Sequence, residues 1–199
     1  MIEKMAEKIS DRFINSNIIK AEEREVYNYC FETTIVMGIS YLILIVLSLV
    51  FKEPLCSFIF LLSFLIFRKT CGGYHAGNYI ICGFMSLASY LVLILAIKNF
   101  QILFHFSFIF LIIGLLIILA FSPIEHKNKP FTEKQYKRFK IISKSLAAVF
   151  IFLFSALELL GLHSAFINKY YFSFCYGIDL AALALLISRI ERSFKNAEV

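Results

Sequence analysis

Residues 102–121 read ILFHFSFIFLIIGLLIILAF, a run without any Asp, Glu, Lys or Arg. A helix of about 20 residues crosses the roughly 30 Å hydrocarbon core of a bilayer, so this run predicts a transmembrane helix. Four further runs read in the same way, at residues 33–51, 79–97, 146–162 and 171–190. The shorter run 55–67 predicts a sixth span that is short and tilted, with a re-entrant segment as the alternative.

The composition of the whole chain agrees with this reading. Of 199 residues, 60% are hydrophobic and only 17% are charged, which lies outside the range of soluble domains. We therefore expect an all-α integral membrane protein with about six transmembrane helices, forming a single membrane domain over residues 1–199. Within it we expect an amphipathic helical segment at 1–32, a transmembrane bundle at 33–190 with a polar loop at 68–82, and a cytoplasmic tail at 191–199.

The N-terminal segment carries apolar residues at helical spacing, with charged residues between them: Ile2, Met5, Ile9 and Phe13. This pattern predicts an amphipathic helix. Such a helix either lies on the inner leaflet of the membrane or packs against the protein's own cytoplasmic loops. The sequence favours neither over the other.

Lysine and arginine are distributed very unevenly between the two sides of the predicted bundle. Seventeen fall on the side of the N-terminus, and three, Lys52, Lys98 and Lys169, fall on the other. Because cytoplasmic loops carry the excess of Lys and Arg, both termini are expected in the cytoplasm. The net charge of +6 then follows from topology and from contact with the lipid bilayer, and no nucleic-acid partner is expected.

A polar stretch interrupts the apolar runs at residues 68–82, which read RKTCGGYHAGNYIIC. A chain that only spanned lipid would have little use for three glycines, two cations, two thiols and an imidazole within one short segment. Five cysteines are an odd number, and those on the reducing side are expected to be free thiols. The stretch therefore predicts a reactive site at the cytoplasmic membrane face.

Cys82 is the preferred nucleophile of this stretch. Asn78 is a good N-cap for a helix that begins near Tyr79, which places Cys82 in the first turn, where the helix dipole, nearby Arg68 and an imidazole favour the thiolate. His75 is the candidate base. In one continuous helix the two would be about 10.5 Å apart along the axis, so the helix must break between them.

Glycines supply that break, at Gly72, Gly73 and Gly77. Two alternatives remain open. Cys71 is a rival nucleophile, four residues from His75. In the other reading, His75 hydrogen-bonds a loop carbonyl and both thiols only pack in the bundle.

A zinc site made of Cys71, His75, Cys82 and the distant His126 is another reading of the same residues. The spacing contains no CxxC pair, so neither a metal nor any other cofactor is expected.

Polar residues outside this stretch have less specific readings. The linker at 122–145 is basic and could bind an acidic substrate segment, although positive-inside topology is the favoured explanation. Its candidate substrate-binding residues are Lys127, Lys129, Lys134, Lys137 and Arg138. Glu158 and Asp179 lie in apolar spans, and structural or interfacial roles are favoured for them. They leave open a small peptide exporter as an alternative function, and a non-catalytic membrane subunit is a second alternative.

The order Arg68, Gly72-Gly73, His75 and Cys82, followed by further spans and a basic linker, resembles the accessory gene regulator protein B family. The resemblance implies a membrane cysteine endopeptidase that cleaves a quorum-sensing propeptide on the cytoplasmic side. His75 and Cys82 match the family's catalytic pair, and Arg68 and Gly73 match positions of importance.

The same resemblance implies an acyl-enzyme on Cys82 and closure of a thiolactone or lactone ring. It implies as partner a small propeptide with amphipathic and acidic segments. It also favours a homodimer, which small residues such as Gly114 permit but do not require.

Overall fold

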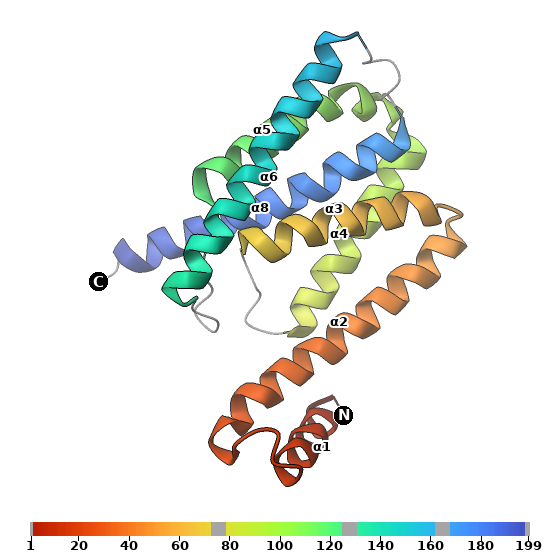
Figure 1. Ribbon diagram of the computed structural model, residues 1–199. Coiled ribbons are helices and arrows are strands. Elements are labelled where there is room, and N and C mark those ends of the chain that lie inside the picture. Colours follow the sequence, from red (N-terminus) through yellow and green to blue (C-terminus); the bar gives the residue numbers. More distant parts are fainter. Residues whose placement is uncertain (1, 73–78, 125–130, 162–167, 198–199) are drawn as a thin grey trace. The chain divides into compact units, whose positions relative to one another are not determined.

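The computed structural model describes residues 2–72, 79–124, 131–161 and 168–197, with only the backbone described at 79, 80, 82 and 194–197. Figure 1 shows that the described elements are helices. In chain order they are α1 (Ile2–Asn15), η1 (Ala21–Glu23), α2 (Arg24–Val50), α3 (Pro54–Cys71), α4 (Tyr79–Asn99), η2 (Gln101–Phe106), α5 (Ser107–Phe121), α6 (Glu133–Leu159) and α8 (Lys169–Ala197).

Five described helices are long and apolar enough to cross a membrane: α2, α3, α5, α6 and α8, two of them together with the short 3-10 helix that precedes them. In α4 the apolar stretch with described side chains runs from Gly83 to Asn99 and is shorter. The prediction of an all-α integral membrane protein is confirmed.

The chain divides into two compact units, the first made of residues 1–52 and 76–91. In this unit the amphipathic helix α1 packs on α2. The Phe13 and Phe31 rings lie 5.4 Å apart between centroids, and Arg24 Nε donates to Asp11 Oδ1 at 2.9 Å. That hydrogen bond lowers the pKa of Asp11 below its ordinary value. Within the described residues, helix α1 thus packs against another helix of the same chain, α2.

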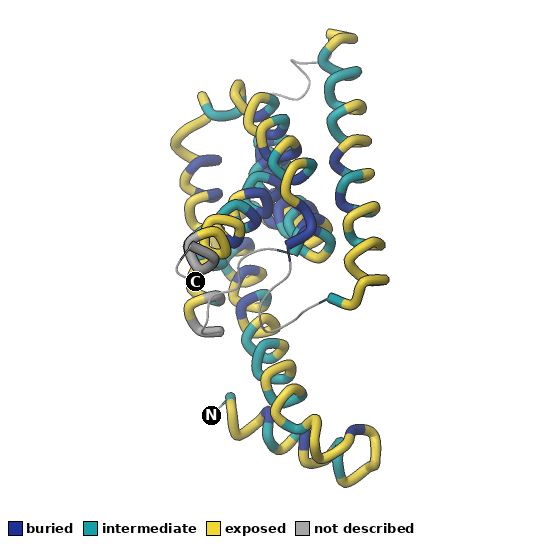
Figure 2. The backbone as a smooth tube through the Cα atoms, turned by 90° about the vertical axis from the view of Figure 1, so that its left-hand side faces the viewer, coloured by how far each residue is buried: buried dark blue, intermediate teal, exposed yellow. Residues whose placement is uncertain are grey.

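The second unit comprises residues 53–75 and 92–199. Helices α3 and α5 pack along α8, and α6 packs against α5 and α3. The buried residues in Figure 2 gather where these helices meet, and the core they form includes Phe67, Leu111, Leu115, Ile178 and Leu185. Because two units are resolved by their contacts, the single membrane domain stays a prediction.

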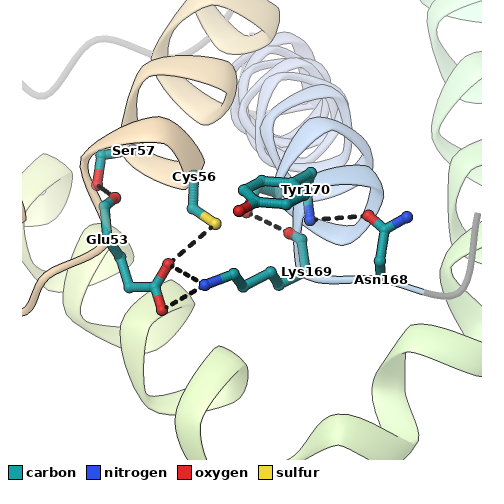
Figure 3. A network of polar contacts seen from close by, with 7 residues as sticks. Glu53, Cys56, Ser57, Asn168, Lys169 and Tyr170 are labelled. Atoms are coloured by element: carbon teal, nitrogen blue, oxygen red, sulfur yellow. Dashed lines mark hydrogen bonds and ion pairs between the residues drawn. The ribbon is translucent and has the colours of Figure 1, made fainter.

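The beginnings of α3 and α8 are joined by a polar network (Figure 3). Glu53 precedes Pro54, which starts α3 at a position where a missing N–H is tolerated. Its carboxylate accepts from Lys169 Nζ, and one of its oxygens lies 3.3 Å from Cys56 Sγ. The Asn168 side chain caps α8 by accepting from the backbone N–H of Tyr170 and of Tyr171. The ion pair thus joins the two helix starts at one end of the unit, and the Asn168 side chain caps α8.

Three predicted boundaries differ from the observed ones. The run 55–67 belongs to an 18-residue helix that continues through Arg68 to Cys71. The basic linker 122–145 is helical from Glu133 onward, because α6 starts well before the apolar run. The run 102–121 begins as the 3-10 helix η2 before it continues as α5.

Candidate functional site

The polar stretch 68–82 is shared between two helices and the segment that joins them. Residues 68–71 form the last turn of α3, and residues 79–82 form the first turn of α4. The segment 73–78 lies outside the described residues, and with it Gly73, His75, Gly77 and Asn78. The predicted pairing of His75 with Cys82 therefore stays a prediction.

The two candidate nucleophiles occupy opposite kinds of helix end. Cys82 lies in the first turn of α4, as the sequence predicted, although its side chain is outside the described part. Cys71 is the last residue of α3 and is 0% exposed. A helix C-terminus carries partial negative charge, which disfavours a thiolate, and burial denies a substrate access. The described structure therefore argues against Cys71 as the nucleophile.

Gly72 ends α3 in a conformation that requires glycine. Its φ is +72°, in the left-handed region. It forms an isolated parallel bridge with Ile124, and the Ile124 backbone N–H donates to the Cys71 carbonyl oxygen at 3.0 Å. A Cβ built on Gly72 would overlap the Ile124 carbonyl oxygen. Both the φ angle and this close approach exclude a side chain at this position.

Arg68 contacts the same turn from the side of α3. Its Nη1 donates to the Gly72 carbonyl oxygen at 2.5 Å, and the side chain is half-buried. A cation that hydrogen-bonds the last carbonyls of a helix also interacts favourably with the helix dipole. The sequence predicts that Arg68 supports the thiolate, and in the described structure its side chain holds the backbone just before the segment 73–78.

The residues that meet Gly72 come from the short segment Ser122–Ile124, which we call the strap. Ser122 follows α5, and its N–H donates to the Ile118 carbonyl at 3.0 Å. The Ser122 and Ser143 hydroxyls lie 2.8 Å apart, which ties the strap to α6. All three strap residues are buried. No feature of the sequence distinguished the strap, because its bridge joins residues far apart in the chain.

The candidate substrate-binding cations divide between described and undescribed residues. Lys127 and Lys129 lie outside the described part. Lys134, Lys137 and Arg138 are exposed in the first turns of α6. They thus belong to the same helix as an apolar span.

Helix α6 begins with a reciprocal cap that the sequence reading overlooked. Thr132 Oγ1 accepts from the Gln135 N–H at 3.3 Å, and Gln135 Oε1 accepts from the Thr132 N–H at 3.0 Å. Thr-Glu-Lys-Gln at residues 132–135 has the spacing of a capping box. That signature, visible in the sequence, would have placed the helix start correctly.

Asp179 borders a pocket of about 430 Å³ formed by α5, α8 and the second half of α4. The pocket is lined mainly by apolar side chains, with Ser107 and Tyr176 also at its wall. Among the described residues, Asp179 Oδ1 is buried without a hydrogen-bond partner. Gly114 faces this oxygen, and a Cβ there would overlap it. Glu158 lies near the end of α6 and is half-buried.

The zinc alternative depends mainly on side chains outside the described residues. The described residues contain no group of three His, Cys, Asp or Glu side chains able to hold a metal ion. Three of the four ligands weighed for zinc, His75, Cys82 and His126, have side chains outside that description.

These features define an all-helical integral membrane protein in which a polar Cys/His segment joins two apolar helices. The chain belongs to the Accessory gene regulator B family, whose model matches residues 2–188. This confirms the resemblance noted from the sequence and places the chain in peptide processing for accessory gene regulator quorum sensing.

Two relatives illustrate the similarity. Putative AgrB-like protein 2 of Clostridium perfringens (strain 13 / Type A) is 28% identical over 161 residues, covering 77% of this chain and 75% of the relative. Accessory gene regulator protein B of Staphylococcus intermedius is 27% identical over 146 residues, covering 71% and 73%. No solved structure matches the chain.

Proposed function

We propose that this protein is a membrane cysteine endopeptidase that cleaves a quorum-sensing propeptide with Cys82 as nucleophile and His75 as base. The observation that carries the proposal is the contrast between the two thiols of the polar stretch. Cys82 belongs to the first turn of α4, whereas Cys71 is sealed at the end of α3. Membership in the Accessory gene regulator B family supports a role in peptide processing.

The proposed reaction proceeds through an acyl-enzyme. Cys82 Sγ, whose proton passes to the His75 imidazole, forms a bond to the scissile carbonyl carbon of the propeptide. The carbon–nitrogen bond then breaks, and the imidazolium returns its proton to the departing amine. The C-terminal fragment leaves, and the N-terminal fragment remains as a thioester on Cys82.

Ring closure then exchanges one acyl acceptor for another. A cysteine or serine side chain of the held fragment attacks the thioester carbonyl, and Cys82 leaves as a thiol with the proton released by the attacking group. The product is a thiolactone or a lactone. Exclusion of water preserves the activated acyl group, because hydrolysis would give a linear peptide.

The proposed substrate is a small propeptide with amphipathic and acidic segments, met at the cytoplasmic face. The exposed cations Lys134, Lys137 and Arg138 at the start of α6 support this charge preference, together with Lys127 and Lys129. The count of lysine and arginine supports an orientation with both termini in the cytoplasm.

The test is co-expression of the chain with a candidate propeptide, a small peptide with amphipathic and acidic segments, followed by separation of precursor and fragments. Cys82→Ser and His75→Ala should abolish cleavage, while Cys71→Ser should retain it. Intact mass spectrometry of the wild type should also reveal a covalent adduct on Cys82 that hydroxylamine removes. Cleavage that persists in Cys82→Ser would refute the proposed nucleophile.

A further inference from the structure

We propose that the strap, residues 122–124, is a positioning element of the peptidase: through Gly72 it fixes the backbone from which the segment carrying His75 departs. The inference rests on the proposed function, since it assigns a role to residues around the proposed catalytic pair. It adds Ile124, Ser122 and Ser143 to the residues on which catalysis depends, although none of them would touch the substrate.

The turn after α3 is held from two sides. The Ile124 N–H satisfies the Cys71 carbonyl, and the Arg68 guanidinium satisfies the Gly72 carbonyl. The last carbonyls of a helix ordinarily lack partners within the helix. Here two independent groups satisfy them, so both the position and the direction of the chain at Gly72 are set by contacts outside the loop itself.

The strap is itself anchored to the helices around it. Ile124 is 4% exposed and belongs to the same buried cluster as Phe67 and Ala147. Ser122 and Ser143 share a buried hydroxyl pair, and the Ser122 N–H continues the hydrogen bonding of α5. The strap is therefore fixed to α3, α5 and α6 together, and close packing of this kind leaves a segment little room to shift.

The anchored turn lies close in the sequence to the proposed general base. His75 follows Gly72 by three residues, and a chain of that length reaches at most about 11 Å. A general base must come within roughly 2.6–3.2 Å of the proton it accepts, and a misplacement of about 1 Å can reduce a rate about 100-fold. A support placed three residues before the base thus limits where the base can act.

A substitution at Gly72 tests this directly. Gly72→Ala forces a Cβ against the Ile124 carbonyl oxygen and into a left-handed φ, so the bridge must open. Gly38→Ala is the matched control, because Gly38 is an exposed helical glycine with open space around its Cβ position. We expect Gly72→Ala to slow propeptide cleavage by at least about tenfold, short of the full contribution of a general base, and Gly38→Ala to cleave at the wild-type rate.

A second readout separates positioning from a general loss of structure. In a Cys30→Ser background, the rate of alkylation of Cys82 by iodoacetamide is measured against pH, with the modified residue identified by mass spectrometry. If the strap acts through His75, Gly72→Ala should shift this profile toward higher pH, as His75→Ala does. The double variant should then react no more slowly than His75→Ala alone, since two changes on one path are not additive.

The outcomes distinguish the two proposals. If Cys82→Ser still cleaves, the proposed function fails, whatever Gly72→Ala does. If Cys82→Ser is inactive but Gly72→Ala cleaves and alkylates like Gly38→Ala, the positioning role alone is overturned. Multiplicative effects in the double variant would also overturn it.

Ser122→Ala provides a variant that keeps glycine in place. It removes the hydroxyl pair with Ser143 without adding bulk, so it should fold even if Gly72→Ala does not accumulate. We expect it to change the alkylation profile in the same direction by a smaller amount. A wild-type profile and a wild-type cleavage rate in Ser122→Ala would count against the strap.

Discussion

Lys169 Nζ lies 2.9 Å from one carboxylate oxygen of Glu53 and 2.8 Å from the other, across 116 residues of sequence. The pair joins the start of α3 to the start of α8 and is partly buried, since the Glu53 side chain is only 15% exposed. Both oxygens of the carboxylate are therefore engaged by one ammonium group.

The first prediction concerns this ion pair. Glu53→Gln and Lys169→Met should each lower the melting temperature of the detergent-solubilised protein. The double variant should lose less than the sum of the two, with a coupling free energy of about 1 kcal/mol, because the Lys169 side chain is partly solvent-exposed. Strictly additive losses would mean that the two groups do not stabilise each other.

The second prediction concerns Gly114 and Asp179. Gly114→Ala places a methyl group against the buried Asp179 Oδ1. We expect a loss of about 1–3 kcal/mol, as is usual for overpacking, measured by thermal unfolding. In an Asp179→Ala background the same substitution should cost little, because the opposing oxygen is absent. An equal loss in both backgrounds would show that the alanine meets some other group.

The third prediction is a pH dependence of the contact between α1 and α2. The Arg24 hydrogen bond lowers the pKa of Asp11, so the folded value lies below the ordinary value of about 3.9. The stabilisation is thus present above about pH 4 and is lost as the pH falls through the lowered value. Double electron–electron resonance between spin labels on α1 and α2 should show the distance between the two helices increasing as the pH falls through the lowered value. Asp11→Asn should remove this pH dependence.

The fourth prediction concerns the start of α6. Thr132→Ala removes the hydroxyl that accepts from the Gln135 N–H and should cost about 1 kcal/mol. Because the change is local, faster hydrogen exchange is expected in the first two turns of α6. Thr132→Ser keeps the acceptor and should retain slow exchange there.

The fifth prediction orders the thiols by their access to reagents. Cys30 is exposed, whereas Cys56, Cys71 and Cys175 are buried. A bulky maleimide should therefore modify Cys30 within the time in which those three remain unmodified in the folded protein. Rapid labelling of Cys71, measured by peptide mapping, would reopen its candidacy as the nucleophile.

The apolar spans could be predicted because hydropathy alone reports them, but helix ends depend on other interactions. The thirteen apolar residues at 55–67 mark only the apolar part of α3, which reaches Cys71. There, Arg68 satisfies a carbonyl beyond the helix end. At α6, hydropathy detected only the apolar portion, while the capping box at Thr132 determines the actual start.

The candidate site was predictable only where it depends on residues close together in the sequence. A thiol in the first turn of α4 follows from local sequence, and the structure places Cys82 there. The contact of Gly72 with Ile124 could not be predicted, because nothing local to either residue indicates its partner. The sequence predicts a break in the helix at the Gly-Gly pair, but what Gly72 approaches is decided by tertiary packing.

Helix α6 runs without interruption from Glu133 to Leu159, so its charged beginning and its apolar remainder share one helical register. Each added residue rotates everything beyond it by about 100°. The side of the helix from which Lys137 and Arg138 project is therefore set by the number of residues that separate them from Ser143. The Ser143 hydroxyl contacts Ser122. A single alanine inserted between Lys140 and Ser143 would move Lys137 and Arg138 to another side of the helix, relative to Ser143, without changing the net charge.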